Sequence, residues 1–214
     1  MKFQHGWAFP DVDEFMVNQL HADGSYQGSH LDAALLHVKD FSLAIDGGAH
    51  VGTWSKPLSA RFEHVIAVEP SPDTFEALQR NLEAFGCANV DARNIAIGAA
   101  PGSVSMMLDG RGAELANTGA RYVQGKGTIP MEPIDAWGLP TLGFLKLDIE
   151  GSEFAALVGA RKTLLRCRPI VLFENKNLWK RYGADRNAPH GFLIQLGYRQ
   201  LAKISMDEIW GPSR

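Results

Sequence analysis

The sequence predicts a doubly wound α/β domain built on a mostly parallel sheet. Short apolar runs of strand type alternate with runs of helical spacing, which is the pattern of βαβ units. Several of the apolar runs end in a glycine or a carboxylate, where a parallel sheet holds its ligands. The chain has 214 residues, of which 45% are hydrophobic and 21% charged, and these values suit one domain with one core.

Seven runs are predicted as strands of the sheet. They are short, rich in β-branched and large apolar residues, and bounded by turn residues. In chain order they span Phe41–Asp46, His64–Glu69, Val90–Gly98, Leu142–Asp148, Pro169–Glu174, Tyr198–Ala202 and Glu208–Trp210. A further strand candidate, Ser103–Leu108, lies in a glycine-rich stretch.

The best-defined helix follows the second strand. Ser71 offers an N-cap, Pro72 fits the first helical position, and Gly86 can end the helix in a left-handed conformation. Between them, apolar residues recur at helical spacing at Phe75, Leu78, Leu82 and Phe85. The other core helices are predicted over Thr53–Arg61, from Ser152 to about Cys167, and over Gly191–Leu196.

The whole chain, residues 1–214, is predicted to form a single domain. Its parts are an N-terminal helical cap, a core, a glycine-rich insertion within that core, and a C-terminal strand or tail, over residues 1–40, 41–202, 98–127 and 203–214. The cap contains two amphipathic segments, Val12–Leu20 and Leu31–Val38, which we expect to pack across one end of the sheet. An insertion of this length in a compact domain is usually functional or mobile.

Charge and composition exclude several classes of protein. The 21 basic and 24 acidic side chains give a net charge of −3, which does not support nucleic-acid binding. No apolar run approaches a membrane span of roughly 20 residues, and the first residues lack the features of a signal peptide. The two cysteines, Cys87 and Cys167, are isolated, which disfavours a disulfide framework or a zinc site. We therefore expect a cytoplasmic protein with no membrane or nucleic-acid partner.

The turns after the first two predicted strands indicate a cofactor that carries a nucleoside. Gly48 and Gly52 allow the backbone to approach a ligand closely and to turn sharply into a helix. Glu69, at the end of the second strand, can accept hydrogen bonds from both hydroxyls of a ribose.

The residues around Gly48 distinguish two such cofactors. A dinucleotide fingerprint has glycine at the position of Ala49, so the match to a pyrophosphate site is imperfect. Asp46 is poorly placed beside a pyrophosphate but suits a cationic amino group, such as that of S-adenosylmethionine. The alternative, that Asp46 only caps the next helix, stays open.

Three motifs together resemble those of the FkbM-type methyltransferases. They are Asp46-x-Gly48-Ala49-x-x-Gly52, Glu69-Pro70-x-Pro72 with Phe75, Leu78 and Asn81, and Lys146-x-Asp148-x-Glu150-Gly151-x-Glu153 with Gly159. The resemblance covers about residues 41–202 and implies a seven-stranded Rossmann-like fold with S-adenosylmethionine as cofactor. It also implies methyl transfer to a hydroxyl group of a sugar or another natural product. The sequence departs from the family at Gly47 and His50, where an apolar residue and often Asn are expected.

The resemblance and the positions at strand ends assign residues to the cofactor. The predicted cofactor-binding residues are Asp46, Gly48, Ala49, His50, Gly52, Glu69, Asn94 and Ala96. Asp46 is expected near the methionine part of the cofactor, and Asn94 to Ala96 beside the adenine. For Asn94, a simple strand-exit turn is an equally good explanation.

Asp148 and Glu150 are the predicted catalytic residues. Their spacing puts both on one side of the sheet if the strand continues that far. As a pair of carboxylates, each can raise the pKa of the other and so supply a general base. The alternative is that Glu150 and its neighbours provide a negatively charged entrance to the following helix.

A metal site is a further alternative at the same edge of the sheet. Asp148, Glu174 and Asn175 follow neighbouring strands and could converge as three oxygen ligands of the kind that suit Mg²⁺. The layout resembles that of some catechol-type methyltransferases. Because adjacent strands bring such residues together easily by chance, we predict no metal requirement.

Other side chains are candidates for a base or for contacts with an acceptor. The alternative bases are His50, His190 and Lys176, although a lone histidine is more often a packing residue. The residues that could line a sugar-binding surface, or form only a solvated turn, are Trp179, Lys180, Arg181 and Tyr182. The residues of the insertion that could meet an anionic acceptor, or only keep the loop soluble, are Arg111, Arg121, Tyr122 and Lys126.

We therefore predict an S-adenosylmethionine-dependent O-methyltransferase that acts on a small-molecule or carbohydrate acceptor. Two other functions are kept as alternatives. A nicotinamide-dependent oxidoreductase is disfavoured by Ala49 and Asp46, and a non-catalytic S-adenosylmethionine-binding module is disfavoured by the pair of Asp148 and Glu150.

Overall fold

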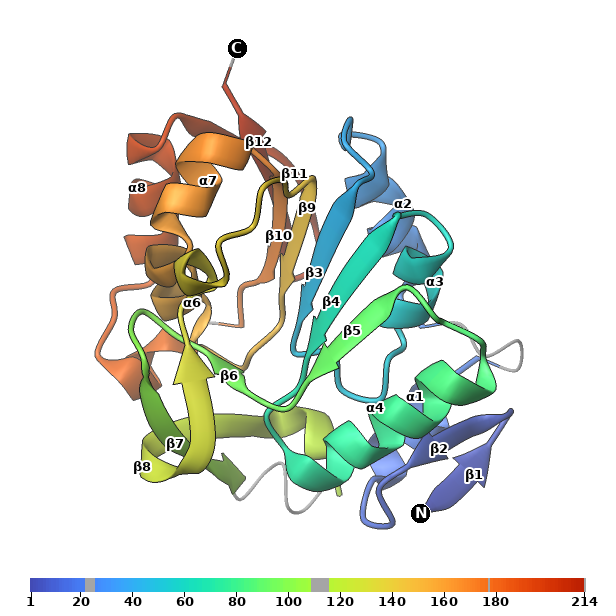
Figure 1. Cartoon of the computed structure of the whole chain (residues 1–214). Coiled ribbons are helices and arrows are strands. Elements are labelled where there is room, and N and C mark those ends of the chain that lie inside the picture. The colour runs from blue at the N-terminus through green and yellow to red at the C-terminus, as the bar shows by residue number, and fades with distance from the viewer. Residues whose placement is uncertain (22–25, 109–115, 177, 214) are drawn as a thin grey trace.

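The computed structural model describes residues 1–21, 26–108, 116–176 and 178–213, and its centre is a seven-stranded sheet (Figure 1). The strand order is β11-β12-β10-β9-β3-β4-β5, and β12 alone runs against its neighbours. The strands span Leu43–Gly47 (β3), His64–Val68 (β4), Val90–Arg93 (β5), Phe144–Leu147 (β9), Ile170–Glu174 (β10), Tyr198–Ile204 (β11) and Asp207–Pro212 (β12). The predicted doubly wound, mostly parallel sheet of seven strands is confirmed.

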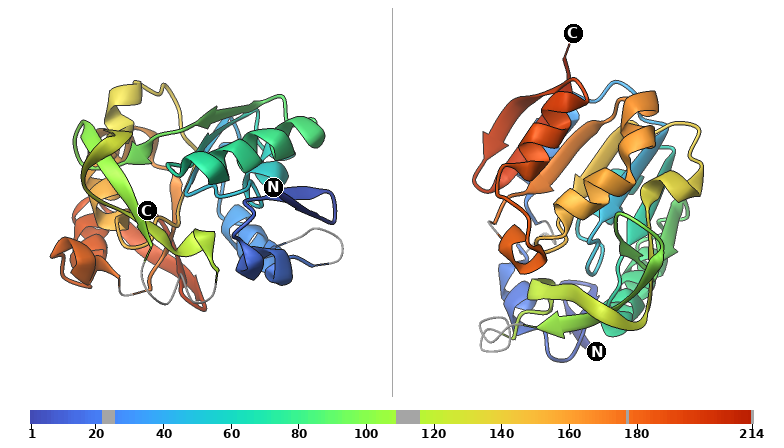
Figure 2. Two further views of the ribbon diagram at one scale, coloured as in Figure 1. Left: turned by 90° about the horizontal axis from the view of Figure 1, so that it is seen from below. Right: turned by 90° about the vertical axis from the view of Figure 1, so that its left-hand side faces the viewer.

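Helices cover both faces of the sheet (Figures 1 and 2). One face carries Glu153–Gly159 (α6), Arg161–Cys167 (α7) and Ala188–Gln195 (α8). The other face carries Gly28–Leu35 (α2), Ser55–Ser59 (α3) and Pro72–Ala84 (α4). Burial of both faces explains why the strands are continuous apolar runs rather than alternating ones.

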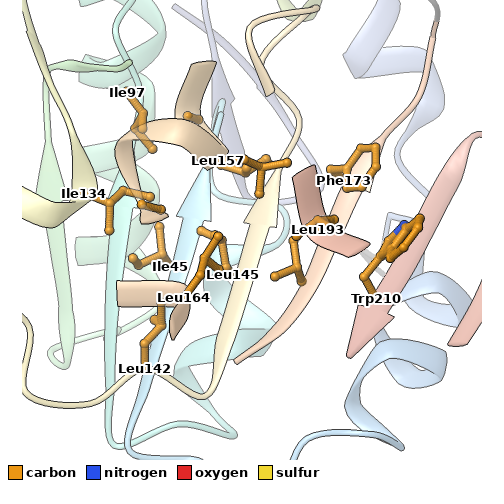
Figure 3. Close-up of a cluster of buried hydrophobic side chains, with 14 of the residues drawn as sticks. Ile45, Ile97, Ile134, Leu142, Leu145, Leu157, Leu164, Phe173, Leu193 and Trp210 are labelled. Atoms are coloured by element: carbon orange, nitrogen blue, oxygen red, sulfur yellow. The ribbon is translucent and has the colours of Figure 1, made fainter. Parts of the chain in front are cut away.

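The larger core lies between the sheet and α6, α7 and α8. Ile45 of β3 and Leu145 of β9 pack there against Leu157 of α6 and Leu164 of α7, and all four are fully buried (Figure 3). Burial of one such side chain contributes roughly 1.5 to 3 kcal/mol, so this layer fixes β3 and β9 side by side. The carboxyl ends of these two strands are therefore held at fixed positions relative to each other.

The helix predicted after the second strand is α4. Ser71 is its N-cap, Pro72 is its first residue, and Gly86 adopts a φ of +66° just beyond its end. The Ser71 hydroxyl does not cap the backbone of the first turn; it donates to the carboxylate of Asp73 (2.8 Å). The boundaries follow the sequence signals, whereas the detail of the cap does not.

Two predicted elements are each divided in two. The predicted strand Val90–Gly98 becomes β5 and a short strand, Ala96–Ile97 (β6), which pairs in a second sheet. The predicted helix between the fourth and fifth strands breaks at Ala160, where α6 ends and α7 begins. The carboxylate of Asp135 accepts a hydrogen bond from the backbone N–H of Thr163 (2.8 Å) and so supports the start of the new helix.

The glycine-rich insertion forms most of this second sheet, with the order β6-β8-β7. The predicted strand appears as Gly102–Leu108 (β7), and it pairs antiparallel with Arg121–Glu132 (β8). The long strand β8 was not predicted, because Gly125, Gly127 and Pro130 interrupt its apolar pattern. The sheet lies below the carboxyl ends of the central strands (Figure 1).

The N-terminal segment is only partly the helical cap that was predicted. The two amphipathic segments form Glu14–Gln19 (α1) and α2, but Lys2–Gln4 (β1) and Trp7–Phe9 (β2) add a hairpin. Asn81 of α4 holds the hairpin: its side chain accepts from the backbone N–H of Ala8 (2.7 Å) and donates to the carbonyl of Ala8 (2.9 Å).

The described part of the chain also contains three short 3₁₀ helices, over Thr118–Ala120 (η1), Ile134–Trp137 (η2) and Trp179–Tyr182 (η3). Within the described residues, no helix is both long enough and apolar enough to cross a membrane.

Candidate functional site

The candidate site is a pocket at the carboxyl ends of β3, β4 and β9. Strand order reverses at β3, because β4 and β5 lie on one side of it and β9 and β10 on the other. Open α/β sheets bind their ligands at such a point. The hairpin, α1 and the β7–β8 sheet lie below this edge, so they can cover what the strands hold (Figure 1).

The loop after β3 is folded by left-handed residues. Gly48, His50 and Gly52 have φ values of +74°, +51° and +96°. A side chain at Gly48 would overlap the carbonyl oxygen of Asp148, so only glycine lets the loops after β3 and β9 come this close. Gly48 and Ala49 line the pocket, whereas Gly52 does not and packs beside α4.

Glu69 presents a buried carboxylate to the pocket, with 7% of the residue exposed. Its two oxygens accept from the backbone N–H groups of His50 (3.0 Å) and Ser71 (2.8 Å). Burial raises the pKa of Glu69, and His50 and these N–H groups oppose the rise. Asn94 does not line the pocket; it donates to the carbonyls of Glu69 (2.8 Å) and Pro70 (3.1 Å) and so fixes the turn.

Asp46 lies beneath the pocket and not in its lining. It is fully buried, and its two oxygens bind Nζ of Lys146 (2.8 Å) and the hydroxyl of Ser55 (2.7 Å). Lys146 also donates to the carbonyl of Gly48 (3.0 Å) and is the member of the pair that lines the pocket. Burial lowers the pKa of Lys146, but the charges of Asp46 and Asp148 outweigh this effect, so the pKa lies above its ordinary value. Asp46 was expected to face the ligand, but Lys146 separates it from the pocket.

Three carboxylates and one ammonium form the opposite wall. Oxygens of Asp148, Glu150 and Glu174 lie within 4.8 Å of one another. Nζ of Lys176 is 2.7 Å from Glu150 Oε1, 2.6 Å from Glu174 Oε2 and 3.8 Å from Asp148 Oδ1. The Asp148 side chain is 32% exposed and lines the pocket, while the two glutamates are nearly buried. The predicted pair of Asp148 and Glu150 is therefore brought together.

A turn, and not strand alternation, places Glu150 in this cluster. Strand β9 ends three residues earlier, and Glu150 and Gly151 adopt φ values of +56° and +105°. A left-handed conformation at a non-glycine residue costs roughly 1 to 2 kcal/mol. Glu153 holds the turn, because its Oε1 accepts from the backbone N–H groups of Ile149 and Gly151 (3.1 Å each). Burial raises the pKa of Glu153 to about 7.

The carboxylates and the ammonium of this cluster shift one another's pKa values. Burial and the neighbouring Asp148 raise the pKa of Glu174. Burial would also raise the pKa of Asp148, but Lys176 and a hydrogen bond with Glu174 bring it below its ordinary value. Burial lowers the pKa of Lys176, and the surrounding carboxylates outweigh this effect and raise it. These shifts favour a proton on Glu174 over one on Asp148, and they disfavour Lys176 as a base.

The predicted metal ligands do not converge as a set. Asn175 turns away and donates to Glu208 Oε1 (2.7 Å). Glu150 lies in its place beside Asp148 and Glu174, and the ammonium of Lys176 already provides these carboxylates with a cation.

Residues from the N-terminal segment and the insertion complete the pocket. They contribute aromatic, apolar and polar side chains: Phe15, Met16, Tyr26, Thr118, Arg121 and Tyr122. Burial raises the pKa of Tyr26, and the charges of Asp148 and Glu174 raise it further. No sequence signal pointed to Tyr26, because its segment matches no motif.

Of the other histidine and lysine candidates, only His50 and Lys176 line the pocket. His190 bonds Glu208 Oε2 (2.7 Å), and its ring stacks on Trp210 with 5.5 Å between centroids, which is a packing role. Lys126 and Lys180 are exposed on the surface.

The aromatic and arginine candidates mainly join the insertion to the core. Arg121 pairs with Asp73 on α4, and the guanidinium of Arg181 lies 4.2 Å from the ring centre of Tyr122. The hydroxyl of Tyr182 donates to a β8 carbonyl (2.9 Å). The remaining two differ: Trp179 is fully buried, and Arg111 lies outside the described residues.

The sheet order and the pocket at its reversal point define a Rossmann-like fold of the methyltransferase type. The sequence also matches the family model of the methyltransferase FkbM domain over residues 46–199, so the chain belongs to this family. The resemblance found in the three motifs is thereby confirmed.

Solved structures share this fold at low sequence identity. An FkbM methyltransferase from Methylobacillus flagellatus KT has 17% identity and a TM-score of 0.53, with 95% of this chain and 48% of that chain covered. This chain thus spans about half the length of that protein. A precorrin-6y C5,15-methyltransferase from Geobacter metallireducens GS-15 has 14% identity and a TM-score of 0.50, with 95% and 91% covered. Among curated proteins, none matches the chain.

Proposed function

We propose that this protein binds S-adenosylmethionine in the pocket and transfers its methyl group to a hydroxyl of a small-molecule or carbohydrate acceptor. The observation that carries the proposal is the pairing of two walls. The buried carboxylate of Glu69 forms one, and the ionised carboxylate of Asp148 forms part of the other. Membership of the FkbM domain family supports methyl transfer. The hydroxyl acceptor rests on the resemblance of the motifs.

The residues of the pocket fit the nucleoside part of this cofactor. Glu69 keeps lone pairs for ribose hydroxyls, and the backbone of Gly48 and Ala49 leaves room beside them. Ala96, which was predicted beside the adenine, lines the pocket and adds an apolar surface together with Ile97. When bound, the cofactor supplies an electrophilic methyl group on a sulfonium.

The chain's own residues would orient the acceptor and remove its proton. Asp148 is the exposed, ionised carboxylate of the cluster, so it is suited to accept a hydrogen bond and then the proton of an acceptor hydroxyl. Lys176 and Glu150 hold Asp148 in place through their ion pair. Much of the rate would come from the alignment of the acceptor, to which a general base adds typically 10²–10⁴-fold.

Calorimetric titration with S-adenosylhomocysteine and with NADH tests the cofactor. We expect saturable binding of S-adenosylhomocysteine and no heat from NADH. Binding of NADH alone would favour the nicotinamide-dependent oxidoreductase and overturn the proposal.

Transfer of a labelled methyl group to a panel of polyols, monosaccharides and phenols tests catalysis. The unaltered protein should label at least one hydroxyl acceptor, and Asp148→Asn should not. Equal labelling by both proteins would remove Asp148 from the mechanism. Tight binding of S-adenosylhomocysteine without transfer to any acceptor class would instead favour a non-catalytic module.

Chelation tests the expectation that no metal is required. Because the ammonium of Lys176 already provides the acidic cluster with a cation, turnover should persist in EDTA. Loss of turnover in EDTA that Mg²⁺ restores would overturn this expectation. The net charge of −3 also favours a small acceptor over a nucleic acid.

A further inference from the structure

Two segments that are far apart in the sequence meet beside the Glu69 wall of the pocket. The carbonyl of Ala116 accepts from the backbone N–H groups of Glu14 (3.0 Å) and Phe15 (3.4 Å), at the start of α1. Phe15 and Thr118 both line the pocket. Residues 13–16 and 116–121 thus form one continuous surface, called the cover below.

A buried network joins this cover to the loop after β3. Asp13 is fully buried, and its Oδ1 accepts from the backbone N–H of Met16 (3.1 Å). The hydroxyl of Thr118 donates to Asp13 Oδ2 (2.5 Å). Nε2 of His50 lies 2.8 Å from Thr118 Oγ1 and 3.1 Å from Asp13 Oδ2. One side chain from each of three segments therefore meets at a single point.

The hydrogen-bonding pattern fixes the role of the histidine. Thr118 has one proton and gives it to Asp13, so Nε2 of His50 must be the donor in its contact with Thr118. Burial raises the pKa of Asp13, but contacts with His50 and Thr118 bring it below its ordinary value, so the carboxylate is ionised. A buried carboxylate needs such donors, which makes the closed arrangement the satisfied one.

His50 also contacts Glu69, which forms one wall of the pocket. Its backbone N–H donates to Glu69 Oε2 (3.0 Å), while its side chain binds the cover. His50 holds a φ of +51°, a conformation that a non-glycine residue adopts only when its surroundings fix it. His50 thus contacts both Glu69 and the cover.

We propose that His50, Asp13 and Thr118 form a latch that keeps the cover closed over the pocket and slows the release of its occupant. The occupant is S-adenosylmethionine or its product, and in this respect the inference rests on the proposed function. His50 and Thr118 line the pocket, and the latch residues act by positioning the cover. Opening the cover breaks the contacts of the His50 ring with Thr118 and with the ionised Asp13.

The sharpest variant is His50→Asn. Asparagine tolerates the left-handed conformation and keeps the backbone N–H that binds Glu69, but it is too short to repeat the contact with Thr118. We expect S-adenosylhomocysteine to dissociate about tenfold faster in a stopped-flow displacement experiment. The KM for S-adenosylmethionine should rise by a larger factor than kcat changes. Thr118→Val, which removes only the hydroxyl, should act in the same direction.

His30→Ala provides a matched control. It removes a comparable contact, between His30 Nδ1 and Asp207 Oδ2 (2.6 Å), in a pair that does not line the pocket. Its thermal stability should fall by a similar amount, while the rate of S-adenosylhomocysteine release should stay that of the unaltered protein. Faster release in all three variants would attribute the effect to general destabilisation and overturn the latch.

Amide hydrogen exchange on the ligand-free protein gives a readout that is independent of activity. His50→Asn and Thr118→Val should accelerate exchange at Phe15, Met16 and Gly119, and His30→Ala should not. Unchanged exchange at these amides, or faster exchange with an unchanged release rate, would overturn the inference. If the unaltered protein bound no S-adenosylhomocysteine, the proposed function would fail, and the exchange data would still decide whether the latch exists.

Discussion

The two walls of the pocket are built in different ways. On the β3–β4 side, backbone N–H groups hold a single carboxylate, Glu69, and the residues that supply them lie in two short loops. On the β9–β10 side, Asp148, Glu150, Glu174 and Lys176 hold one another through side-chain charge. The first wall depends on the path of the chain, whereas the second depends on protonation. We therefore expect substitutions on the first wall to change binding and those on the second to change turnover.

Asp148→Asn should give the largest effect and belongs to the second wall. The amide cannot take the proton of an acceptor hydroxyl, so kcat should fall by about 10²–10⁴-fold. The affinity for S-adenosylhomocysteine should change little. Single-turnover methyl transfer and calorimetry on the same protein measure the two quantities. If the variant lost affinity and kept its kcat, the assignment of turnover to the second wall would be wrong.

Lys146→Met tests the buried ion pair of Lys146 and Asp46, which lies between the two walls at the floor of the pocket. The substitution leaves the fully buried Asp46 with only the Ser55 hydroxyl, and removal of one partner of a buried ion pair costs about 3–5 kcal/mol. Urea unfolding should show this loss in the free energy of unfolding. Lys162→Met, at an exposed lysine, should leave it unchanged. The double variant Asp46→Leu, Lys146→Met should recover part of the loss, and no recovery would argue against the buried charge as its cause.

Glu153 gives the pH dependence of the second wall. The folded protein holds its proton up to about pH 7, whereas an unperturbed glutamate loses it near 4.5. Between these values the folded state binds more protons than the unfolded state, so stability falls as the pH rises, by about 3 kcal/mol in total. Glu153→Gln imitates the protonated form and should remove this dependence. Urea unfolding from pH 4 to pH 8 checks it, and parallel curves for the two proteins would contradict it.

Glu69→Gln should give the smallest effect and belongs to the first wall. Replacing one carboxylate oxygen with an amide N–H₂ removes an acceptor for ribose hydroxyls, so S-adenosylhomocysteine should bind about tenfold more weakly. Glu63→Gln, at an exposed glutamate near the start of the same strand, is the control and should bind normally. Unchanged affinity in calorimetry would remove Glu69 from the cofactor site.

The sequence could predict the strands and the loops that follow them, because these depend on local signals. Gly48, Glu69 and Asp148 stand at strand ends, and the ends of parallel strands share one edge. It could not predict the partner of Asp46, because Lys146 lies 100 residues away and reaches it only through the pairing of β3 with β9. The position of Tyr26 depends on tertiary packing in the same way.

The hairpin near the N-terminus had a weak signal that was overlooked. His5 and Gly6 both adopt positive φ, at +50° and +82°, as two-residue hairpin turns require. The usual signal of such a turn is asparagine or aspartate before glycine, whereas this chain has histidine in that place. Strand β8 was concealed in a similar way, since Gly127 sits where a side chain would overlap the backbone of Val104.

The contact between Gly48 and Asp148 limits how this pocket can be altered. There is no room for a side chain between the loops after β3 and β9, so neither loop can move toward the other. Redesign of acceptor choice is therefore best aimed at α1 and the β7–β8 sheet, which line the pocket from outside the central sheet. The loops after β3 and β9 would then stay unchanged, while the segments that cover the pocket are replaced.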